Sequence, residues 1–329
     1  MMINYFIFTC FTFIIFFLVN RLSFRFKLFD TPSTRKIHKK KTPYTGGIAL
    51  FLLILIIVKF TDVDFHLNQI FIYSFIILII GFLDDKYNIN VGTKTLGQIL
   101  SIFFLAELIS LDSLNKIFFF NNFELGSFGI IFTILCLIVL INSFNYLDGS
   151  DGVCAVSFLI PFNLIFFVQY QRIIIPTDLV IFINIILFIF ILFNFSTFKL
   201  PKMFLGDSGS LMLGYILGFI SIYYYSISKT IEVIEVMWIL SFPVFEFLST
   251  NISRIKRGSR IFKPGFDHLH HIFLKKYNSL ITFIIIIFIQ IFIIFAGLFS
   301  YDIFGSDISS FIYVILFLIF FLIREKFIS

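Results

Sequence analysis

Charged residues are scarce in this sequence. Asp, Glu, Lys and Arg make up 13% of the 329 residues and hydrophobic residues make up 59%, whereas soluble domains contain about 25% charged and about 45–50% apolar residues. This balance excludes a soluble globular domain and an intrinsically disordered chain. With 7 Pro and 17 Gly, a collagen-like chain and a long flexible linker are excluded as well. The composition predicts a polytopic membrane protein.

Cysteine is also scarce, and common nucleotide motifs are missing. The three cysteines, Cys10, Cys136 and Cys154, lie in or beside apolar runs, without the paired spacing of a disulfide framework or a Cys-based metal site. The sequence has no Walker loop and no dinucleotide glycine fingerprint of the strand–turn–helix kind. Transport driven by nucleotide hydrolysis therefore has no support in the sequence.

Long apolar runs are abundant. A helix that crosses about 30 Å of hydrocarbon needs about 20 apolar residues. Eleven segments are candidates, several of them short: 3–19, 46–60, 67–83, 95–111, 128–144, 153–169, 177–195, 210–227, 233–250, 279–299 and 309–323. The first lacks the basic start of a signal peptide, so we expect it to remain as a membrane anchor. We expect an all-α polytopic membrane protein of about 10–11 transmembrane helices, forming one domain over 1–329.

Lys and Arg are distributed unevenly between the loops. If the chain crosses the membrane eleven times, 21 of the 25 Lys and Arg fall on one side. By the positive-inside rule this side is cytoplasmic, so we expect the N-terminus outside and the C-terminus in the cytoplasm. The net charge of +6 is spread over these loops, which argues against nucleic acid as a partner. It suits anionic lipid headgroups or phosphorylated substrates.

The acidic clusters fall on this basic side, at the ends of expected helices. Asp84 and Asp85 end one apolar run, and Lys86 and Lys94 follow. Adjacent residues of a helix point about 100° apart, so the two carboxylates serve one site only if the helix ends there or if they have different roles. Two anions this close favour a cation, although a lone Asp-Asp pair is also typical of a solvated helix end.

A second cluster repeats every three residues in NSFNYLDGSDG and comprises Asn142, Asn145, Asp148 and Asp151. On a regular α-helix a step of three drifts by about 60°, so these side chains would fan around the helix. The glycines behind the two Asp allow the chain to leave the helix and bring the carboxylates together. A polar turn between two spans is the alternative.

A third acidic residue, Asp207, opens a later span in FLGDSGS. Small residues at a helix start leave backbone N–H groups free, and the helix dipole there favours phosphate. The carboxylate of Asp207 is also a suitable ligand for a divalent cation. A plain helix N-cap is the alternative.

A histidine run ends the last large basic loop, in DHLHH. It contains Asp267, His268, His270 and His271, and several Arg and Lys precede it. A zinc site is disfavoured because neither Cys nor a suitably spaced third ligand accompanies the histidines. We expect contact with phosphate, since guanidinium and imidazole groups donate hydrogen bonds to phosphate oxygens.

The four motifs, in this order, resemble those of the polyprenyl-phosphate N-acetylhexosamine-1-phosphate transferase family, also called glycosyltransferase family four. The resemblance runs from about Lys36 to His271 and includes the basic segment TRKIHKKKTPYTGGIAL. The His-x-His-His ending resembles the WecA-type branch more than the MraY-type branch. Two departures are visible: Gly265 follows Pro264 where the family usually has Pro-Asp, and Glu246 stands where Asp is common.

The resemblance implies roles for the motif residues. It implies Mg²⁺, with Mn²⁺ as an alternative ion, bound by Asp207 with Asn145, and it places the catalytic residues Asp84 and Asp85 beside the reacting phosphates. The implied substrate-binding residues are Lys94 as a phosphate contact, Asn142, Asp148 and Asp151 in the nucleotide-sugar pocket, and His268, His270 and His271 near the diphosphate.

The implied reaction transfers N-acetylhexosamine 1-phosphate, most simply N-acetylglucosamine 1-phosphate, from a UDP-sugar to undecaprenyl phosphate, and releases UMP. It would start a lipid-linked envelope glycan, such as the O-antigen of lipopolysaccharide, at the cytoplasmic face of the bacterial inner membrane. Two alternatives stay open: the phospho-N-acetylmuramoyl-pentapeptide transferase of peptidoglycan synthesis, and a secondary transporter, whose sites usually lie near the bilayer midplane. The choice of hexosamine and the formation of a homodimer also stay open.

Overall fold

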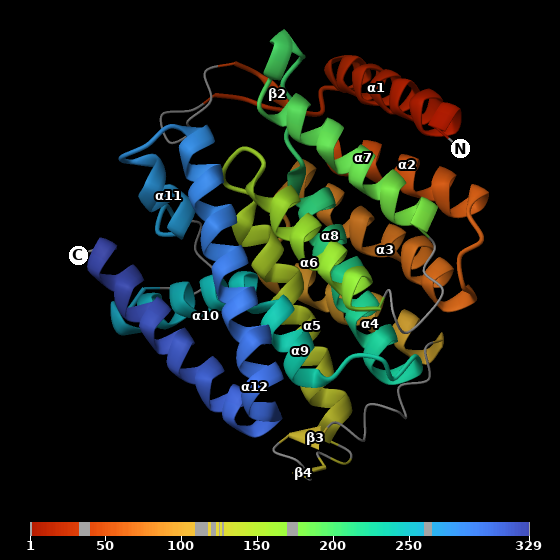
Figure 1. The fold of residues 1–329 in the computed structure, drawn as a ribbon. Helices are drawn as coiled ribbons and strands as arrows, with labels where there is room; N and C mark the ends of the chain where they lie inside the picture. Colours follow the sequence, from red (N-terminus) through yellow and green to blue (C-terminus); the bar gives the residue numbers. More distant parts are fainter. Residues whose placement is uncertain are drawn as a thin grey trace.

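The computed structural model describes residues 2–32, 40–108, 118–119, 123–124, 126, 128–169, 177–259 and 265–328. Helices dominate it (Figure 1). They are α1 (Met2–Arg25), α2 (Gly46–Phe60), α3 (Phe65–Tyr87), α4 (Val91–Leu108), α5 (Phe128–Leu147), α6 (Val153–Gln169), α7 (Thr177–Asn194), α8 (Gly206–Ile222), α9 (Val233–Ile239), α10 (Ser241–Lys256), α11 (Leu269–Leu274) and α12 (Ser279–Ile328). The strands form two antiparallel pairs, β1 (Phe29–Asp30) with β2 (Thr42–Pro43) and β3 (Phe118–Phe119) with β4 (Phe123–Glu124).

Each of the eleven expected segments overlaps at least one helix of the described part of the chain. Among the described residues, six helices are long and apolar enough to cross a membrane, which confirms an all-α polytopic membrane fold. α9 and α10 meet at 71° and together match the expected segment 233–250. α2, α4 and α6 are apolar but shorter, and the end of the segment 95–111 lies outside the described residues.

α12 consists of two arms. Its 50 residues would span about 75 Å as one straight helix, more than twice the hydrocarbon thickness of a bilayer. Gly305 interrupts it with φ 75° and ψ −179°, a conformation essentially restricted to glycine. The chain turns back there, and the second arm, residues 306–328, returns beside α10 (Figure 1). The expected spans 279–299 and 309–323 are these two arms.

α8 lies at the centre of the bundle, and α2, α3, α5 and α6 pack around it (Figure 1). Every residue of α8 is buried except Asp207. Glycines allow the neighbouring helices to approach closely: a side chain at Gly81 of α3 would meet the backbone of Asp207 and Ser208, and one at Gly47 of α2 would meet the backbone of Gly209. The start of α8 is therefore held between α2 and α3.

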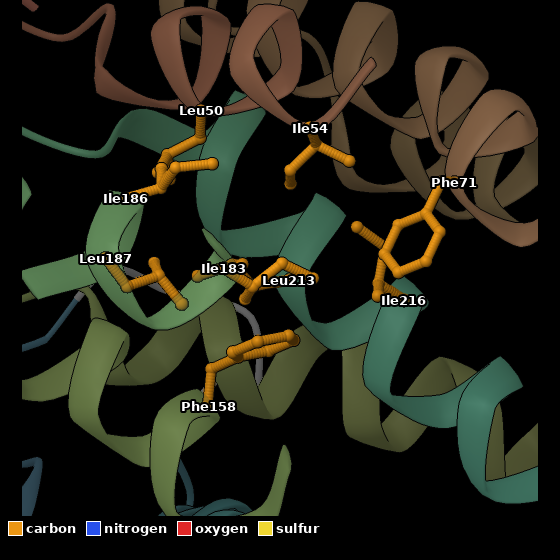
Figure 2. A pocket seen from close by; sticks show the side chains of 9 residues that line it. All are labelled: Leu50, Ile54, Phe71, Phe158, Ile183, Ile186, Leu187, Leu213 and Ile216. Carbon is orange, nitrogen blue, oxygen red and sulfur yellow. The ribbon is translucent and has the colours of Figure 1, made fainter. Parts of the chain in front are cut away.

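The middle of the bundle is apolar and tightly packed. A void of only about 10 Å³ lies among α2, α3, α6, α7 and α8, and Figure 2 shows the side chains around it. All nine side chains that line it are apolar: Leu50, Ile54, Phe71, Phe158, Ile183, Ile186, Leu187, Leu213 and Ile216. Burial of these side chains stabilises the packing of the five helices.

The first loop is hydrogen-bonded to the segment before α8. The backbone N–H of Phe204 donates to the oxygen of Pro43 in β2 at 2.7 Å. In return, the N–H groups of Gly46 and Gly47 donate to the oxygens of Phe204 and Leu205, each at 2.9 Å. These bonds bring the basic first loop beside the start of α8.

Candidate active site

The site begins where α3 ends. Asp84 and Asp85 lie in its last turn, and Tyr87 is its last residue. The carboxylate of Asp85 accepts hydrogen bonds from the backbone N–H groups of Asp207 at 2.9 Å and Ser208 at 3.1 Å. Because the first N–H groups of a helix lack partners within it, Asp85 caps α8. The two neighbouring carboxylates therefore have different partners.

Lys94 of α4 lies at the centre of the cluster. Its Nζ atom is 2.7 Å from Oδ2 of Asp84 and 2.5 Å from Oδ2 of Asp207. It also donates to Oδ1 of Asn145 at 3.3 Å. These charges are mostly shielded from water, so salt screens them less than it screens surface pairs. One ammonium group thus links α3, α4, α5 and α8.

Asn145 and Asn142 lie one turn apart on α5 but have different surroundings. Nδ2 of Asn145 donates to Oδ1 of Asp207 at 2.8 Å and to Oγ of Ser210 at 3.2 Å. Asn142 exchanges two side-chain hydrogen bonds with Gln98 of α4, at 2.9 and 3.3 Å. Asn145 therefore belongs to the acidic cluster, whereas Asn142 joins α4 to α5 beside it.

Asp148 follows α5 and lies against the start of α8. It accepts a hydrogen bond from the backbone N–H of Gly206. Burial, and then the nearby charges of Asp207 and Asp85, raise the pKa of Asp148 well above its ordinary value. Asp148 therefore holds a proton more readily than an exposed Asp does, which limits the negative charge of the cluster.

Asp151 lies further along the same loop and forms an ion pair. Nζ of Lys202 is 2.8 Å from its Oδ2 atom, and Oγ of Ser279 donates to the same oxygen at 3.2 Å. Lys202 comes from the segment before α8 and Ser279 from the first turn of α12. Asp151 therefore ties three segments together at the edge of the site.

The histidine run packs against the second motif. The ring of His268 lies 4.6 Å, centroid to centroid, from the ring of Tyr146 on α5. His270 is fully buried, and a side chain at Gly149 would meet its Nε2 atom. The glycine after Asp148 is therefore required by the close approach of an imidazole ring.

Burial favours the neutral imidazoles of His270 and His271. It lowers the pKa of His270 well below 6.5 and, together with His268, lowers the pKa of His271 to about 4. Both ring nitrogens of His270 and Nδ1 of His271 have no hydrogen-bond partner among the described residues. Burial acts to raise the pKa of Asp267, but the two hydrogen bonds from Arg254, at 2.7 and 2.8 Å, lower it to about 2.

A cavity of about 700 Å³ opens beside the cluster, within the size range of ligand pockets. The expected site residues that line it are Asp84, Asp85, Asp148, Asp151, Asp207 and His271. The others lie outside its wall. Lys94 and Asn145 are hydrogen-bonded to Asp207, and Asn142 is hydrogen-bonded to Gln98. His268 and His270 pack against residues of the second motif. The structure thus gathers ten of the eleven expected residues around one cavity, with Asn142 beside them in the helix packing.

The sequence relates this arrangement to known proteins. The profile of glycosyl transferase family 4 matches residues 67–225, which include the three acidic clusters. A Bacillus subtilis (strain 168) protein named a probable undecaprenyl-phosphate N-acetylglucosaminyl 1-phosphate transferase is 30% identical over 262 residues, covering 77% of this chain and 72% of that relative. The chain belongs to glycosyl transferase family 4.

Other similar proteins carry the name undecaprenyl-phosphate alpha-N-acetylglucosaminyl 1-phosphate transferase. The one from Salmonella typhi is 26% identical over 285 residues, and the one from Escherichia coli (strain K12) is 26% identical over 292 residues. Each alignment covers 84% of this chain and 77% of the relative. The family expected from the four motifs is thereby confirmed.

The cavity of this glycosyl transferase family 4 chain also has lining residues that belong to none of the four motifs. They include Lys27, Asp30, Tyr44 and Lys202. Lys27 and Lys202 could be read in the sequence only as basic loop residues. Their place in the cavity depends on the hydrogen bonds between the first loop and the segment before α8. No local sequence pattern predicts those hydrogen bonds.

Proposed function

We propose that this protein transfers N-acetylglucosamine 1-phosphate from its UDP derivative to undecaprenyl phosphate and releases UMP. The observation that carries the proposal is the convergence of three acidic motifs and Lys94 on one cavity at the helix ends of a membrane protein. The names of the relatives supply the acceptor lipid and the sugar phosphate. A polyprenyl acceptor suits an enzyme whose helices lie in lipid.

In this reaction a phosphate oxygen of the acceptor attacks the β-phosphorus of the UDP-sugar. A bond forms between that oxygen and the β-phosphorus, the bond from the β-phosphorus to the bridging oxygen breaks, and UMP leaves with the bond electrons. A lipid phosphate with a second pKa of about 6 is largely a dianion at neutral pH. The protein therefore needs to position two anions and neutralise their charge more than it needs a strong base.

The residues around Asp207 suit a magnesium ion. Mg²⁺ prefers oxygen ligands and is usually held by one or two carboxylates together with substrate phosphates. Asp207 and Asn145 present such oxygens. Asp84 lies nearby, because it pairs with the same Lys94 ammonium group as Asp207. Among the described residues no group of three or more His, Cys, Asp or Glu side chains is arranged as a metal cage, so substrate oxygens would complete the coordination. Bound there, the ion would neutralise charge on the diphosphate and on leaving UMP.

The basic and neutral donors around the cavity suit the UDP-sugar. Lys202 and Lys27 line its wall, and an ammonium group is an effective phosphate contact. The neutral ring of His271 also lines the cavity and can donate one hydrogen bond to a phosphate oxygen. Asp84, in the last turn of α3, also lines the cavity. By holding Lys94 it would help to position the acceptor phosphate.

The distribution of Lys and Arg supports a cytoplasmic site in the bacterial inner membrane. Lys27, Lys94 and Lys202, at this end of the helices, belong to the basic side of the chain. The N-terminus would then lie outside and the C-terminus in the cytoplasm, where UDP-sugars are available.

A transporter is less well supported than an enzyme. Its carboxylates would lie near the bilayer midplane, but the acidic residues of the described motifs lie at helix ends. The void in the middle of the bundle is apolar and has room for about one water molecule (Figure 2). The five helices that line this void therefore form no polar path for a transported solute in the middle of the bundle.

The test incubates purified protein with undecaprenyl phosphate, UDP-N-acetylglucosamine and Mg²⁺, and measures UMP release with and without a chelator. Magnesium-dependent UMP together with a lipid-linked product supports the proposal. UMP release with UDP-N-acetylmuramoyl-pentapeptide instead would move the protein to the peptidoglycan branch. No release with any UDP-sugar would contradict the proposed activity.

A further inference from the structure

We propose that Arg324 and Glu246 are positioning residues that hold the histidine run at the active site. The inference rests on the proposed function and deepens it, because it gives the second arm of α12 a role in the transferase site. Arg324 lies near the end of that arm, and Glu246 lies in the second turn of α10. In the sequence, Arg324 is one of many basic residues near a membrane span and Glu246 is a departure from the family pattern.

The guanidinium group of Arg324 is surrounded by acceptors, and only 1% of the residue is exposed. Nη2 donates to the backbone oxygen of Asp267 and, at 2.8 Å, to Oγ1 of Thr250. Nη1 donates to the backbone oxygen of Ser249 at 3.5 Å, and Nε lies 3.6 Å from Oε2 of Glu246. A buried charge without a partner is strongly unfavourable. Glu246 supplies the fully buried carboxylate opposite Arg324, and Oε1 of the partly exposed Glu325 lies 3.8 Å from Nη1.

Glu246 is fully buried and uses its other oxygen on the histidine run. Oε1 accepts the backbone N–H of Leu269 at 2.8 Å and the hydroxyl of Thr250 at 3.3 Å. The same oxygen lies 3.6 Å from Nδ1 of His268. Because Leu269 is the first residue of α11, its N–H lacks a partner within that helix. Glu246 therefore caps α11 from α10.

Together the two side chains fix the peptide groups on both sides of His268. Arg324 binds the carbonyl group before it, and Glu246 binds the N–H group after it. The ring of His268 is thereby kept against Tyr146, and the next histidine, His270, against the loop between α5 and α6. A shift of this backbone would move all imidazoles of the run relative to the cavity.

The geometry calls for arginine rather than lysine at position 324. The planar guanidinium reaches acceptors on α10 and on the histidine loop while it faces Glu246. Lysine keeps the positive charge but carries it on one compact ammonium group. The variant Arg324→Lys therefore separates the charge of the pair from its hydrogen bonds, and it stays informative if Arg324→Gln fails to fold.

The test compares these two variants with the native full-length protein in detergent and uses Arg257→Gln as the matched control. Arg257, at the end of α10, also contacts the second arm of α12 through a 3.3 Å ion pair with Glu325. The same Glu325 oxygen lies 3.8 Å from Arg324, but the side chain of Arg257 is 42% exposed and makes no contact with the histidine run among the described residues. UMP release gives kcat and the KM of each substrate. Thermal unfolding in detergent gives the stability of each variant.

A second readout does not depend on activity. Diethyl pyrocarbonate modifies accessible imidazoles, and mass spectrometry of peptides maps the modified sites. In the native protein His268 and His270 are buried and should react slowly. His66, at the far end of α3, serves as the internal reference in each sample.

For Arg324→Lys we expect kcat/KM for the UDP-sugar to fall by about 10-fold or more, as for other residues that orient a site from outside it. For Arg324→Gln we expect about 100-fold. The KM of the UDP-sugar should rise and that of undecaprenyl phosphate should stay unchanged, whereas a simple loss of folded protein lowers kcat alone. Labelling of His268 should rise in both variants, and Arg257→Gln should keep native values.

A native KM for the UDP-sugar together with native histidine labelling in Arg324→Lys would overturn the proposal, whatever Arg324→Gln does. If the native protein releases no UMP with any UDP-sugar, the proposed function is wrong. The labelling of His268 then decides alone whether Arg324 holds the histidine run.

Discussion

At the scale of single residues, the site depends on how charges are shared. Lys94 lies between Asp84 and Asp207, while Asp85 is turned to the backbone of α8. From the sequence, two neighbouring Asp at a helix end either serve one site because the helix ends there or have different roles, because their side chains point in different directions. The sequence could not predict which of them caps α8, since that depends on contacts between residues more than a hundred positions apart.

Asp207→Asn removes the carboxylate that α8 presents to the cavity. We expect the turnover rate to fall by about 100-fold or more, as for other groups that stabilise developing charge. Stability should change little, because Asp84 remains on Lys94. UMP release measures the rate, and Asp62→Asn, in an exposed loop at the other end of α3, is the control. Wild-type turnover in Asp207→Asn would contradict the assignment.

We expect the fold to be stable without a bound cation, because the ammonium group of Lys94 already faces Asp84 and Asp207. Chelation should therefore abolish UMP release and leave the melting temperature unchanged, and added Mg²⁺ should restore activity. In Lys94→Met the two carboxylates repel each other, so Mg²⁺ should raise the melting temperature of that variant by mass action. If Mg²⁺ does not change the melting temperature of Lys94→Met, a metal ion between Asp84 and Asp207 is contradicted.

His271 makes stability depend on pH in a defined direction. Its pKa falls from 6.5 to about 4 in the folded protein because of burial and then the charge of His268. Between pH 6.5 and about 4 the unfolded chain binds a proton at His271 and the folded protein does not. The contribution of neutral His271 to the free energy of unfolding is therefore fully present above pH 6.5 and is lost as the pH falls toward about 4. Melting temperatures from pH 7 to pH 4 should fall less steeply for His271→Asn than for the native protein. A curve for His271→Asn as steep as the native one would contradict this.

At the scale of helices and strands, long apolar runs were enough to locate the helices, and six of these are long and apolar enough to cover the hydrocarbon thickness among the residues that the structure describes. The 71° break between α9 and α10 lies inside a continuous apolar segment, so hydropathy alone does not mark it. Pro243 is the local signal: it lies in the first turn of α10, where a missing N–H costs no helical hydrogen bond. The return of the second arm of α12 depends on Gly305.

Gly81 determines how closely α3 approaches α8. In Gly81→Ala the new methyl group would meet the backbone of Asp207 and Ser208, so the helices must separate or strain. Overpacking of this kind typically costs about 1–3 kcal/mol, and it would weaken the cap that Asp85 provides. We expect a lower melting temperature and slower UMP release. Gly92→Ala, where the nearest atom belongs to a side chain, should behave like the native protein, and an unaffected Gly81→Ala would contradict this contact.

At the scale of the whole molecule, we expect the uneven distribution of Lys and Arg to set the orientation in the membrane. We expect a cysteine at Asn88, beside the cavity, to react only with membrane-permeant maleimides in intact cells, and a cysteine at Asp62 to react with impermeant ones. The three native cysteines are replaced first. The reverse pattern would place the active site outside the cell and contradict the positive-inside assignment.

The overall class and most of the site could be predicted because both leave local marks in the sequence: apolar runs for the spans, and polar side chains at helix ends for the chemistry. The parts that could not be predicted depend on contacts between distant segments. Lys202 reaches Asp151, and Arg324 reaches Asp267, only after the helices have assembled. Before that, each is indistinguishable from a basic residue that sets topology.

The turn at Gly305 also affects how truncated alleles of this gene should be interpreted. Because the second arm of α12 returns to the histidine run, Arg324 acts at the site although it lies more than fifty residues beyond the last motif. A premature stop codon anywhere between the codons for His271 and Arg324 leaves all four motifs intact. A motif search would score such an allele as functional, whereas we expect its product to lack a properly placed histidine run.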